Sequence, residues 1–380
     1  MFRSWQNIRR LAGFSVAVPS SADQPFLLRF GRVTCYAFAI GSVALALLVT
    51  QGIRPLHEQP PVLLFFVAVI LTSWYAGRAT GIMASILSML VLDFFFVSPV
   101  YSLRMELVED RSDFVAFAAA TLLVTTLQHR WRQSHHKLVA MERDMENARQ
   151  IQQRMFPSAP PVLAGFEVGG ACFPAEATGG DLFDYISMPN DCIGIICGDV
   201  SGHGIGPALL MALVRSYLRA LARTLVDPAE ILTEANRLIH DDMEYGRFIT
   251  LFFARLDPST HALVYAGAGH EAHLIDACGK VTTMSSTGLP LGILEEREIG
   301  QGPSIILEHE QILLLLSDGI LETRSAGGEQ FGLTRVLETV KVHRQKPVQE
   351  IAEAIYQAAR DYAGNVAQED DMTIVIVRVR

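Results

Sequence analysis

The chain has 380 residues, a formal net charge of −9 and a mean hydropathy of +0.28, and only 19% of its residues are charged. This composition is too apolar for an ordinary soluble protein. The negative charge, without any basic stripe carrying interleaved aromatic residues, argues against a nucleic-acid partner. The five cysteines form no paired framework, which fits a reducing compartment.

The apolar excess is concentrated near the start of the chain, where four stretches suggest membrane-spanning helices: 33–51, 61–77, 81–97 and 113–128. The first is free of charge and about as long as a bilayer is thick. The other three are shorter and contain many Gly, Ala and Ser residues, which suit close helix packing. We therefore expect a four-helix transmembrane domain over 32–128, after an N-terminal segment 1–31.

Basic residues predict the orientation of these helices. They precede the first stretch, lie between the second and third, and follow the fourth: Arg3, Arg9, Arg10, Arg29, Arg32, Arg78, Arg130, Arg132 and Lys137. The intervening segments 52–60 and 98–112 contain fewer. By the positive-inside rule both termini are cytoplasmic, so we expect a multi-pass protein of the cytoplasmic (inner) membrane. No cleavable signal peptide is visible.

The segment GRATGIMASILSMLVLDFFFVSPVYSL (77–103), continuing into the fourth stretch, resembles the four-helix membrane domain of KdpD-type sensor histidine kinases. This resemblance implies a compact domain with very short external loops. Asp93 lies within the third stretch and has two readings. It is either an intramembrane carboxylate with a function, or an interfacial residue close to Ser98 and Pro99. We assign it no role.

A helical linker is expected over 129–156, since 128–156 contains no proline or glycine. Apolar or small side chains recur there at heptad spacing, interrupted by polar Gln152: Leu138, Met141, Met145, Ala148 and Met155. A coiled coil would make the chain a homodimer through 129–156. The alternative is a single helix docked on its own catalytic domain, which Ile151 would suit. Pro157, Pro160 and Pro161 end the linker.

The remaining segment, 157–380, is expected to be one domain of mixed α and β structure. Strands are predicted near 166–173, 192–199, 248–256, 261–266, 272–276, 311–317 and 372–379, and helices over 206–224, 228–241, 333–343 and 348–363. The helix at 228–241 has a clear start signal. Asp227 is placed at the N-cap, Pro228 at the first position and Glu230 three residues after the cap.

Four aspartates lie at the ends of glycine-punctuated, otherwise apolar segments of this domain. They are Asp181 in GGDLFDY, Asp199 in CGDVSGHG, Asp318 in LLLLSDGILE and Asp370 in EDDMTIVIV. Carboxylates at strand ends, without a Cys/His cluster, suit hard cations such as Mg²⁺ or Mn²⁺. An Asp-Gly pair taken singly is more often a turn. However, a buried strand such as ILLLL (312–316) rarely ends on a carboxylate that lacks a partner.

Several other polar residues of this domain have a plainer interpretation. His203 is as well explained by a loop histidine bonded to backbone as by proton transfer, and Asp184 is expected to be structural. Four cysteines have no metal-type spacing and are expected to be small buried residues: Cys172, Cys192, Cys197 and Cys278.

The four aspartate motifs, in this order, resemble the SpoIIE-type branch of the metal-dependent (PPM, or type 2C) serine/threonine protein phosphatases. The likeness covers 148–380 and includes ARQIQQRMFP (148–157), FITLFFARLD (248–257), AGH (268–270), GLPLGI (288–293) and EQFG (329–332). It implies an α-β-β-α sandwich with two divalent cations, Mn²⁺ or Mg²⁺, in a cleft. The implied ligands are Asp181, Asp199, the carbonyl of Val200, Asp318 and Asp370, with the share of Asp371 left open.

The resemblance implies a membrane-anchored phosphatase that acts on phosphoserine or phosphothreonine of a cytoplasmic regulator, such as an anti-anti-sigma (STAS-domain) protein. Asp181, Asp199, Asp318 and Asp370 would be the catalytic residues. Two alternatives belong to other classes. A sensor kinase would need a phosphoacceptor histidine helix and a Gly-rich ATP lid, and neither is visible. A catalytically silent membrane sensor or scaffold would be expected to have lost metal aspartates, yet all four are present.

Overall fold

The computed structural model describes residues 31–380 except for 53–61, 98, 104–107, 241 and 244–245. The chain divides into two compact units, Met1–Glu142 and Arg143–Arg380. The boundary between the units falls inside the predicted linker 129–156. The predicted segment 1–31 and the loop 52–60 lie almost wholly outside the described residues, as does part of 98–112.

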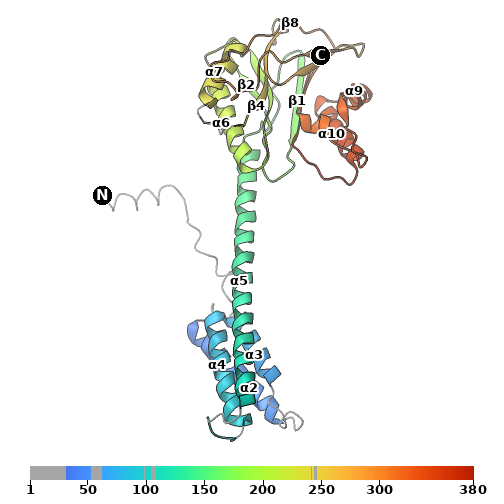
Figure 1. Cartoon of the computed structure of the whole chain (residues 1–380). Coiled ribbons are helices and arrows are strands. Elements are labelled where there is room, and N and C mark those ends of the chain that lie inside the picture. The colour runs from blue at the N-terminus through green and yellow to red at the C-terminus, as the bar shows by residue number, and fades with distance from the viewer. Residues whose placement is uncertain (1–30, 53–61, 98, 104–107, 241, 244–245) are drawn as a thin grey trace, which may run out of the picture. The chain divides into compact units, whose positions relative to one another are not determined.

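The first unit is helical in its described part (Figure 1). It comprises α2 (Arg32–Gly52), α3 (Val62–Ala76), α4 (Arg78–Phe96) and the first part of α5 (Val108–Gln153). Of these, α2 and α4 are long and apolar enough to cross a membrane, and α3 is a shorter apolar helix. The number of membrane-spanning helices therefore stays a prediction.

These helices share one apolar cluster, to which all four contribute: Ala39, Val43, Ala46, Phe65, Ala68, Val69, Ala84, Leu92 and Phe117. Small polar residues join neighbouring helices, as expected where helices pack closely. The hydroxyls of Ser85 and Thr121 lie 2.6 Å apart, and those of Ser42 and Thr72 lie 2.9 Å apart. Asp93 is 6% exposed, and within the described residues its Oδ1 has no hydrogen-bond partner. Its side chain is thus turned into the helix cluster.

Helix α5 continues without a break to Gln153, as the absence of proline and glycine predicts. It ends three residues earlier than expected. Met155, the last position of the proposed heptad seam, lies in the following turn, where its N–H donates to the carbonyl of Gln152 at 2.8 Å. Leu138 and Met141 are 61% and 62% exposed, so these seam positions present apolar surface in the single chain.

The second unit contains two five-stranded antiparallel sheets. One has the order β1-β10-β9-β6-β7 and the other β2-β3-β4-β5-β8. The strands of the first are β1 (Phe166–Phe173), β10 (Met372–Val379), β9 (Ile312–Leu316), β6 (Ala272–Ile275) and β7 (Val281–Met284). Those of the second are β2 (Leu182–Ser187), β3 (Ile193–Val200), β4 (Ile249–Asp257), β5 (Ala262–Ala268) and β8 (Ile305–Ile306).

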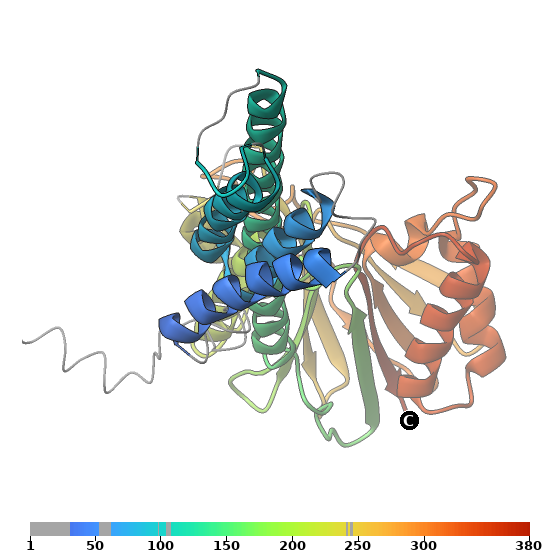
Figure 2. The same ribbon diagram turned by 90° about the horizontal axis from the view of Figure 1, so that it is seen from below.

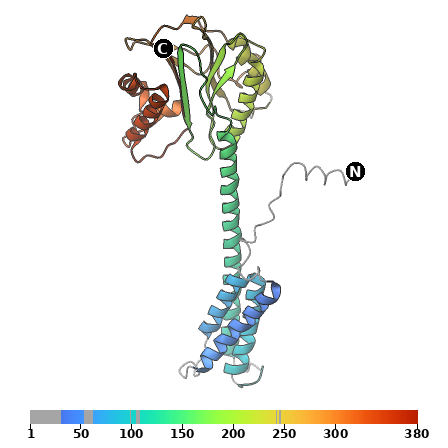
Figure 3. The same ribbon diagram turned by 180° about the vertical axis from the view of Figure 1, so that it is seen from behind.

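Helices cover the outer face of each sheet and complete the expected α-β-β-α sandwich (Figure 3). Helices α6 (Ile205–Leu221) and α7 (Pro228–His240) pack on the β2-β3-β4-β5-β8 sheet. Helices α9 (Gly332–His343) and α10 (Val348–Ala363) pack on the other, and Figure 2 shows this pair in orange and red beside the C-terminal strand. A third apolar cluster, drawn from both sheets, lies between them.

Burial on both faces explains why the strands at the centre of each sheet are almost uniformly apolar. All five residues of ILLLL in β9 are buried, and so are the first six of β10. In α6 the buried positions follow helical spacing at Pro207, Met211, Val214 and Leu218. The cap predicted at Asp227 is confirmed, since its Oδ1 accepts a hydrogen bond from the N–H of Ala229 at 2.9 Å.

The predicted elements are confirmed to within a few residues, and four elements are missing from the prediction: β2, β7, β8 and the short helix α8 (Asp318–Glu322). Asp318 therefore begins a helix, whereas the expectation was a strand end followed by a turn. Cys278 was expected to be buried, and this expectation was wrong. The residue is exposed in the turn between β6 and β7, which does not pack against the core.

Candidate metal centre

The two sheets bring the predicted aspartates to one end of the sandwich. Asp181 directly precedes β2, and the pairing of Leu182 with Gly198 places it beside Asp199 on β3. On the other sheet, Ile374 pairs with Leu316, so the start of β10 lies beside the end of β9. Asp370 and Asp371 precede β10, and Asp318 follows β9. Antiparallel pairing thus gathers residues that are far apart in sequence.

Asp371 connects these strand ends. Its Oδ1 accepts a hydrogen bond from the N–H of Ala175 at 2.8 Å, and its Oδ2 accepts one from the N–H of Asp181 at 3.4 Å. Its carbonyl accepts the hydroxyl of Ser317 at 3.2 Å, just before Asp318. The Asp371 carboxylate therefore braces the loop that carries Asp181, which gives it a supporting position that the sequence left open.

The double glycine before Asp181 permits a very close approach of two chain segments. A methyl group at Gly180 would lie 2.6 Å from the carbonyl oxygen of Val200 and 3.3 Å from Oδ1 of Asp199. No side chain fits in that space. The glycine therefore lets the Val200 carbonyl and the Asp199 carboxylate lie beside the Asp181 loop.

The electrostatics show mutual repulsion among the carboxylates. Asp181 is 2% exposed, and burial followed by the nearby charge of Asp199 raises its pKa well above the usual range. The pKa of Asp199 is raised to about 7, first by burial and then by the charges of Asp318, Asp370 and Asp371. Burial and the charge of Asp318 also raise the pKa of Asp370. The fold therefore gathers negative charge in a largely buried region.

These residues fit a divalent cation in charge and in donor type. Oδ2 of Asp181 is buried and has no hydrogen-bond partner among the described residues, although a buried carboxylate oxygen normally has one. Carboxylates and a backbone carbonyl are the oxygen donors that Mg²⁺ and Mn²⁺ prefer. Within the described residues, no three His, Cys, Asp or Glu side chains form a compact, ready-made metal cluster. Asp318, Asp370 and Asp371 lie near enough to Asp199 to raise its pKa, but the described side chains are not arranged as a closed metal-ion site.

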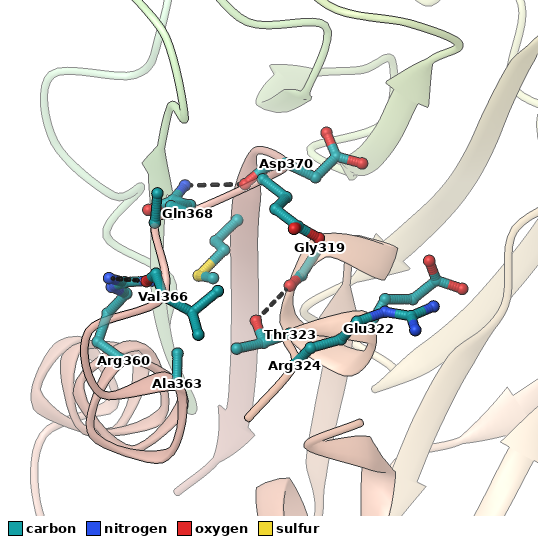
Figure 4. A pocket seen from close by; sticks show the side chains of 12 residues that line it. Gly319, Glu322, Thr323, Arg324, Arg360, Ala363, Val366, Gln368 and Asp370 are labelled. Atoms are coloured by element: carbon teal, nitrogen blue, oxygen red, sulfur yellow. Dashed lines mark hydrogen bonds between the residues drawn. The ribbon is translucent and has the colours of Figure 1, made fainter. Parts of the chain in front are cut away.

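A cavity of about 190 Å³ adjoins this region (Figure 4). Its lining includes Gly319, Thr323, Arg360, Gln368, Asp370 and Met372. Figure 4 shows Gln368 donating to the Asp370 carbonyl, at 2.9 Å, and Thr323 donating to the Gly319 carbonyl, at 2.7 Å. Neither Asp181 nor Asp199 lines this cavity. It therefore lies next to the acidic region and does not enclose it.

Asp184 is structural, as expected. Its carboxylate is fully buried, and Arg215 contacts it at 3.0 Å and Arg219 at 2.5 Å. Both arginines come from α6, so this ion pair attaches that helix to β2. His203 is exposed, and its Nδ1 lies 3.1 Å from a carboxylate oxygen of Glu176. It bonds a side chain, not backbone, and contacts none of the metal-centre aspartates.

His270, in the AGH motif, was not singled out from the sequence. It is buried, its Nδ1 lies 3.1 Å from Oγ1 of Thr250, and Thr250 pairs with Asp199 across β3 and β4. Burial lowers the pKa of His270 to about 4, so the ring is neutral at physiological pH. The AGH string was the only sequence signal, and its partner Thr250 lies 20 residues away.

Comparison with known proteins decides the family. Residues 189–380, just over half of the 380-residue chain, match the family described as Stage II sporulation protein E (SpoIIE). The chain belongs to the SpoIIE family. Its second unit is a serine/threonine protein phosphatase domain of the PP2C type, the metal-dependent class that the aspartate motifs indicate. Residues 36–141 match a family described as a domain of unknown function, DUF4118, consistent with a KdpD-like membrane domain.

Relatives and solved structures agree with this assignment. Phosphoserine phosphatase RsbU of Bacillus subtilis (strain 168) is 27% identical over 254 residues, which cover 65% of this chain and 74% of RsbU. Phosphoserine phosphatase RsbP of the same organism is 26% identical, over 63% of this chain and 58% of RsbP. The SiaA-PP2C domain of Pseudomonas aeruginosa matches 64% of this chain and 99% of its own with a TM-score of 0.57 and 22% identity, which confirms the fold.

The Asp184 ion pair can be separated from the metal centre by mutation. In the double variant R215M/R219M, Asp184 stays buried without a cation. We therefore expect the free energy of unfolding to fall by roughly 3–5 kcal/mol. The measurement is denaturant unfolding of the full chain in detergent. The variant D184N removes the negative charge of Asp184 itself. It should therefore lower the free energy of unfolding by less than R215M/R219M does. Equal stability of the double variant and the native chain would contradict a structural role.

Proposed function

We propose that this chain is a membrane-anchored, metal-dependent phosphatase that removes phosphate from phosphoserine or phosphothreonine of a cytoplasmic protein. The observation that carries the proposal is the gathering of Asp181, Asp199, Asp318 and Asp370 at one end of the sandwich, where burial and neighbouring carboxylates raise the pKa values of Asp181, Asp199 and Asp370. A region of this kind is unfavourable to the fold unless a cation or a proton neutralises it. Divalent cations supply that neutralisation in a phosphatase of this family.

The residues of the centre have separate roles. Asp181, Asp199, Asp318, Asp370 and the carbonyl of Val200 would hold two divalent ions, Mn²⁺ or Mg²⁺. When bound, such ions lower the pKa of water and neutralise the oxygens of a phosphoryl group. Asp371 accepts hydrogen bonds from the backbone at Ala175 and Asp181, and so fixes the loop from which the first ligand projects. No cysteine nucleophile is needed, because bound cations would supply the activation of water.

The substrate we propose is a phosphorylated anti-anti-sigma (STAS-domain) regulator. The support is the family resemblance, together with two relatives that are named phosphoserine phosphatases, RsbU and RsbP. Incubation of the full chain with phosphorylated STAS proteins from the same genome, followed by measurement of released phosphate, tests this substrate. The alternative, a silent scaffold, predicts no metal-dependent hydrolysis even of p-nitrophenyl phosphate.

The first functional prediction concerns the metal ligands. Replacing Asp199 or Asp318 by Asn keeps the size of the side chain but removes a ligand charge, so metal affinity falls. Activity of the full chain on p-nitrophenyl phosphate at low Mn²⁺ should fall by about 100-fold or more, with partial rescue at high Mn²⁺ in the milder variant. D361N, on the exposed face of α10, is the matched control and should retain native activity. Unchanged turnover of both ligand variants would eliminate the assignment.

A second prediction concerns membrane topology. We propose four spans with both termini and the catalytic unit in the cytoplasm, supported by the distribution of basic residues and by the apolar helices α2, α3 and α4. Reporter fusions at residues 79 and 135 should read as cytoplasmic, and fusions at 56 and 105 as external. An external reading at 135 would place the phosphatase unit in the wrong compartment and would refute this topology.

A third prediction concerns the linker, which we propose forms a homodimer through 129–156 and transmits the state of the membrane unit. Helix α5 is unbroken over 46 residues, so an insertion near Arg143 rotates the rest of the helix and the phosphatase unit by about 100° per residue. Inserting one residue should therefore shift activity in membranes strongly, up or down. Inserting seven restores the phase to within about 20° and should leave activity near normal. Equal activity across both insertions would mean that the helix is a passive spacer.

A further inference from the structure

Residues 269–271 carry the chain from one sheet to the other at the metal end of the sandwich. They join β5, in the β2-β3-β4-β5-β8 sheet, to β6 in the second sheet. The end of β5 lies beside the start of β4, where Thr250 pairs with Asp199. The start of β6 lies beside the end of β9, which Asp318 follows closely. The crossover therefore lies between two groups of candidate metal ligands.

The crossover has a fixed backbone. The N–H of Gly269 donates to Oγ of Ser286 at 2.7 Å and to the carbonyl of Gly288 at 3.0 Å. The φ angle of Gly269 is 69°, and a methyl group there would lie 2.4 Å from Cγ of Pro290. A left-handed backbone in such close contact requires glycine. The next residue, His270, therefore starts from a well-defined location.

The side chain of His270 is directed between the two sheets and is 8% exposed. Its Nδ1 lies 3.1 Å from Oγ1 of Thr250, which is opposite Asp199. On the other sheet it interacts with the backbone of Leu316, the last residue of β9. Its Nε2 has no hydrogen-bond partner of ordinary geometry among the described residues, so the contact with Leu316 is the weaker one. One ring thus contacts both sheets, on each side close to a metal-centre aspartate.

Such a contact matters because the candidate ligands are divided between the sheets. Asp181, Asp199 and the Val200 carbonyl belong to strand ends of one sheet, and Asp318 and Asp370 to strand ends of the other. Apolar contacts hold the sheets together, but they are not directional. A cation such as Mg²⁺ requires its ligands at about 2.0–2.1 Å, so the separation of the sheets must be set more sharply. A hydrogen bond from a fixed crossover has the direction that apolar packing lacks.

We propose that His270 is a positioning residue that sets the separation of the two groups of ligands, and so determines how tightly the centre binds its divalent cations. The inference rests on the proposed function, since it requires Asp199 and Asp318 to be metal ligands. It gives the AGH motif a role in the site. The ring is neutral at physiological pH, so it acts through position and adds no charge that would repel a cation.

The test uses the full chain in detergent and two variants. H270L removes both ring nitrogens and keeps an apolar side chain, whereas T250V keeps the shape of Thr250 and removes only the hydroxyl. The readout is the dissociation constant for Mn²⁺ from calorimetric titration. We expect H270L to bind Mn²⁺ about 10-fold or more weakly, as is typical when a partner that orients metal ligands is lost, and T250V to change in the same direction. The kcat of both at saturating Mn²⁺ should stay close to native, because every ligand is still present.

His273 supplies a matched control. It is also buried, and its Nδ1 lies 3.5 Å from Oγ1 of Thr283. These two residues pair between β6 and β7, so their contact stays within one sheet. H273L should lower the Tm of the metal-free chain, as loss of a buried polar contact does, but should leave Mn²⁺ affinity native. The comparison separates positioning across the sheets from a general loss of stability.

A double-mutant cycle and a conservative variant complete the test. H270L/T250V should bind Mn²⁺ no more weakly than H270L, because both changes remove the same hydrogen bond. H270N, whose amide oxygen takes the place of Nδ1, should restore part of the affinity, and T250V carries the test where H270L does not fold. Native Mn²⁺ affinity in H270L and T250V, equal weakening in H273L, or a lower kcat with unchanged Mn²⁺ affinity would each overturn the inference and leave the proposed function standing. Absence of Mn²⁺ binding by the native chain would overturn the proposed function itself.

Discussion

The phosphatase unit depends on an unbalanced charge. Strand ends from two sheets bring several carboxylates into a buried region, where burial and neighbouring carboxylates raise the pKa values of Asp181, Asp199 and Asp370. Asp184 shows the opposite arrangement only three residues from Asp181, since two arginines of α6 neutralise it. The same segment thus carries one carboxylate whose partners are built into the fold, and another, Asp181, whose Oδ2 has no hydrogen-bond partner among the described residues.

This difference explains how the surrounding structure is built. Carboxylates that repel one another must be held together by elements that are stable without them. The two sheets and their three apolar clusters provide that stability. Close contacts at Gly179 and Gly180 then bring backbone, and not only side chains, into the metal region. The acidic groups are therefore held in place by interactions that lie elsewhere in the unit.

Much of the fold could be predicted from local patterns, and the failures have physical causes. β9 and β10 are buried on both faces and appear in the sequence as apolar runs. Asp227 indicates the start of α7 because it is a typical N-cap residue. β2 was not predicted, because Asp184 places a charged side chain at a buried position of LFDYIS. The arginines that neutralise this carboxylate lie 31 and 35 residues further along the chain. β7 and β8 are short and carry little pattern. The aspartates were visible from their motifs, whereas Gln152 showed only as a polar residue in an apolar seam, because its hydrogen-bond partner Gly179 lies 27 residues away.

The adjacent pair Asp370 and Asp371 directly precedes a strand, where successive side chains point to opposite sides. Asp370 lines the cavity, while Asp371 reaches the loop before β2. A slip of β10 by one residue would move one of these carboxylates into the other's place and bring a flanking residue, Glu369 or Met372, into the position it left. Pairing with β1 along its whole length, and with β9 on its other side, prevents such a slip. Hydrogen bonds along β10 as far as its C-terminal end therefore fix which of the two carboxylates occupies each position.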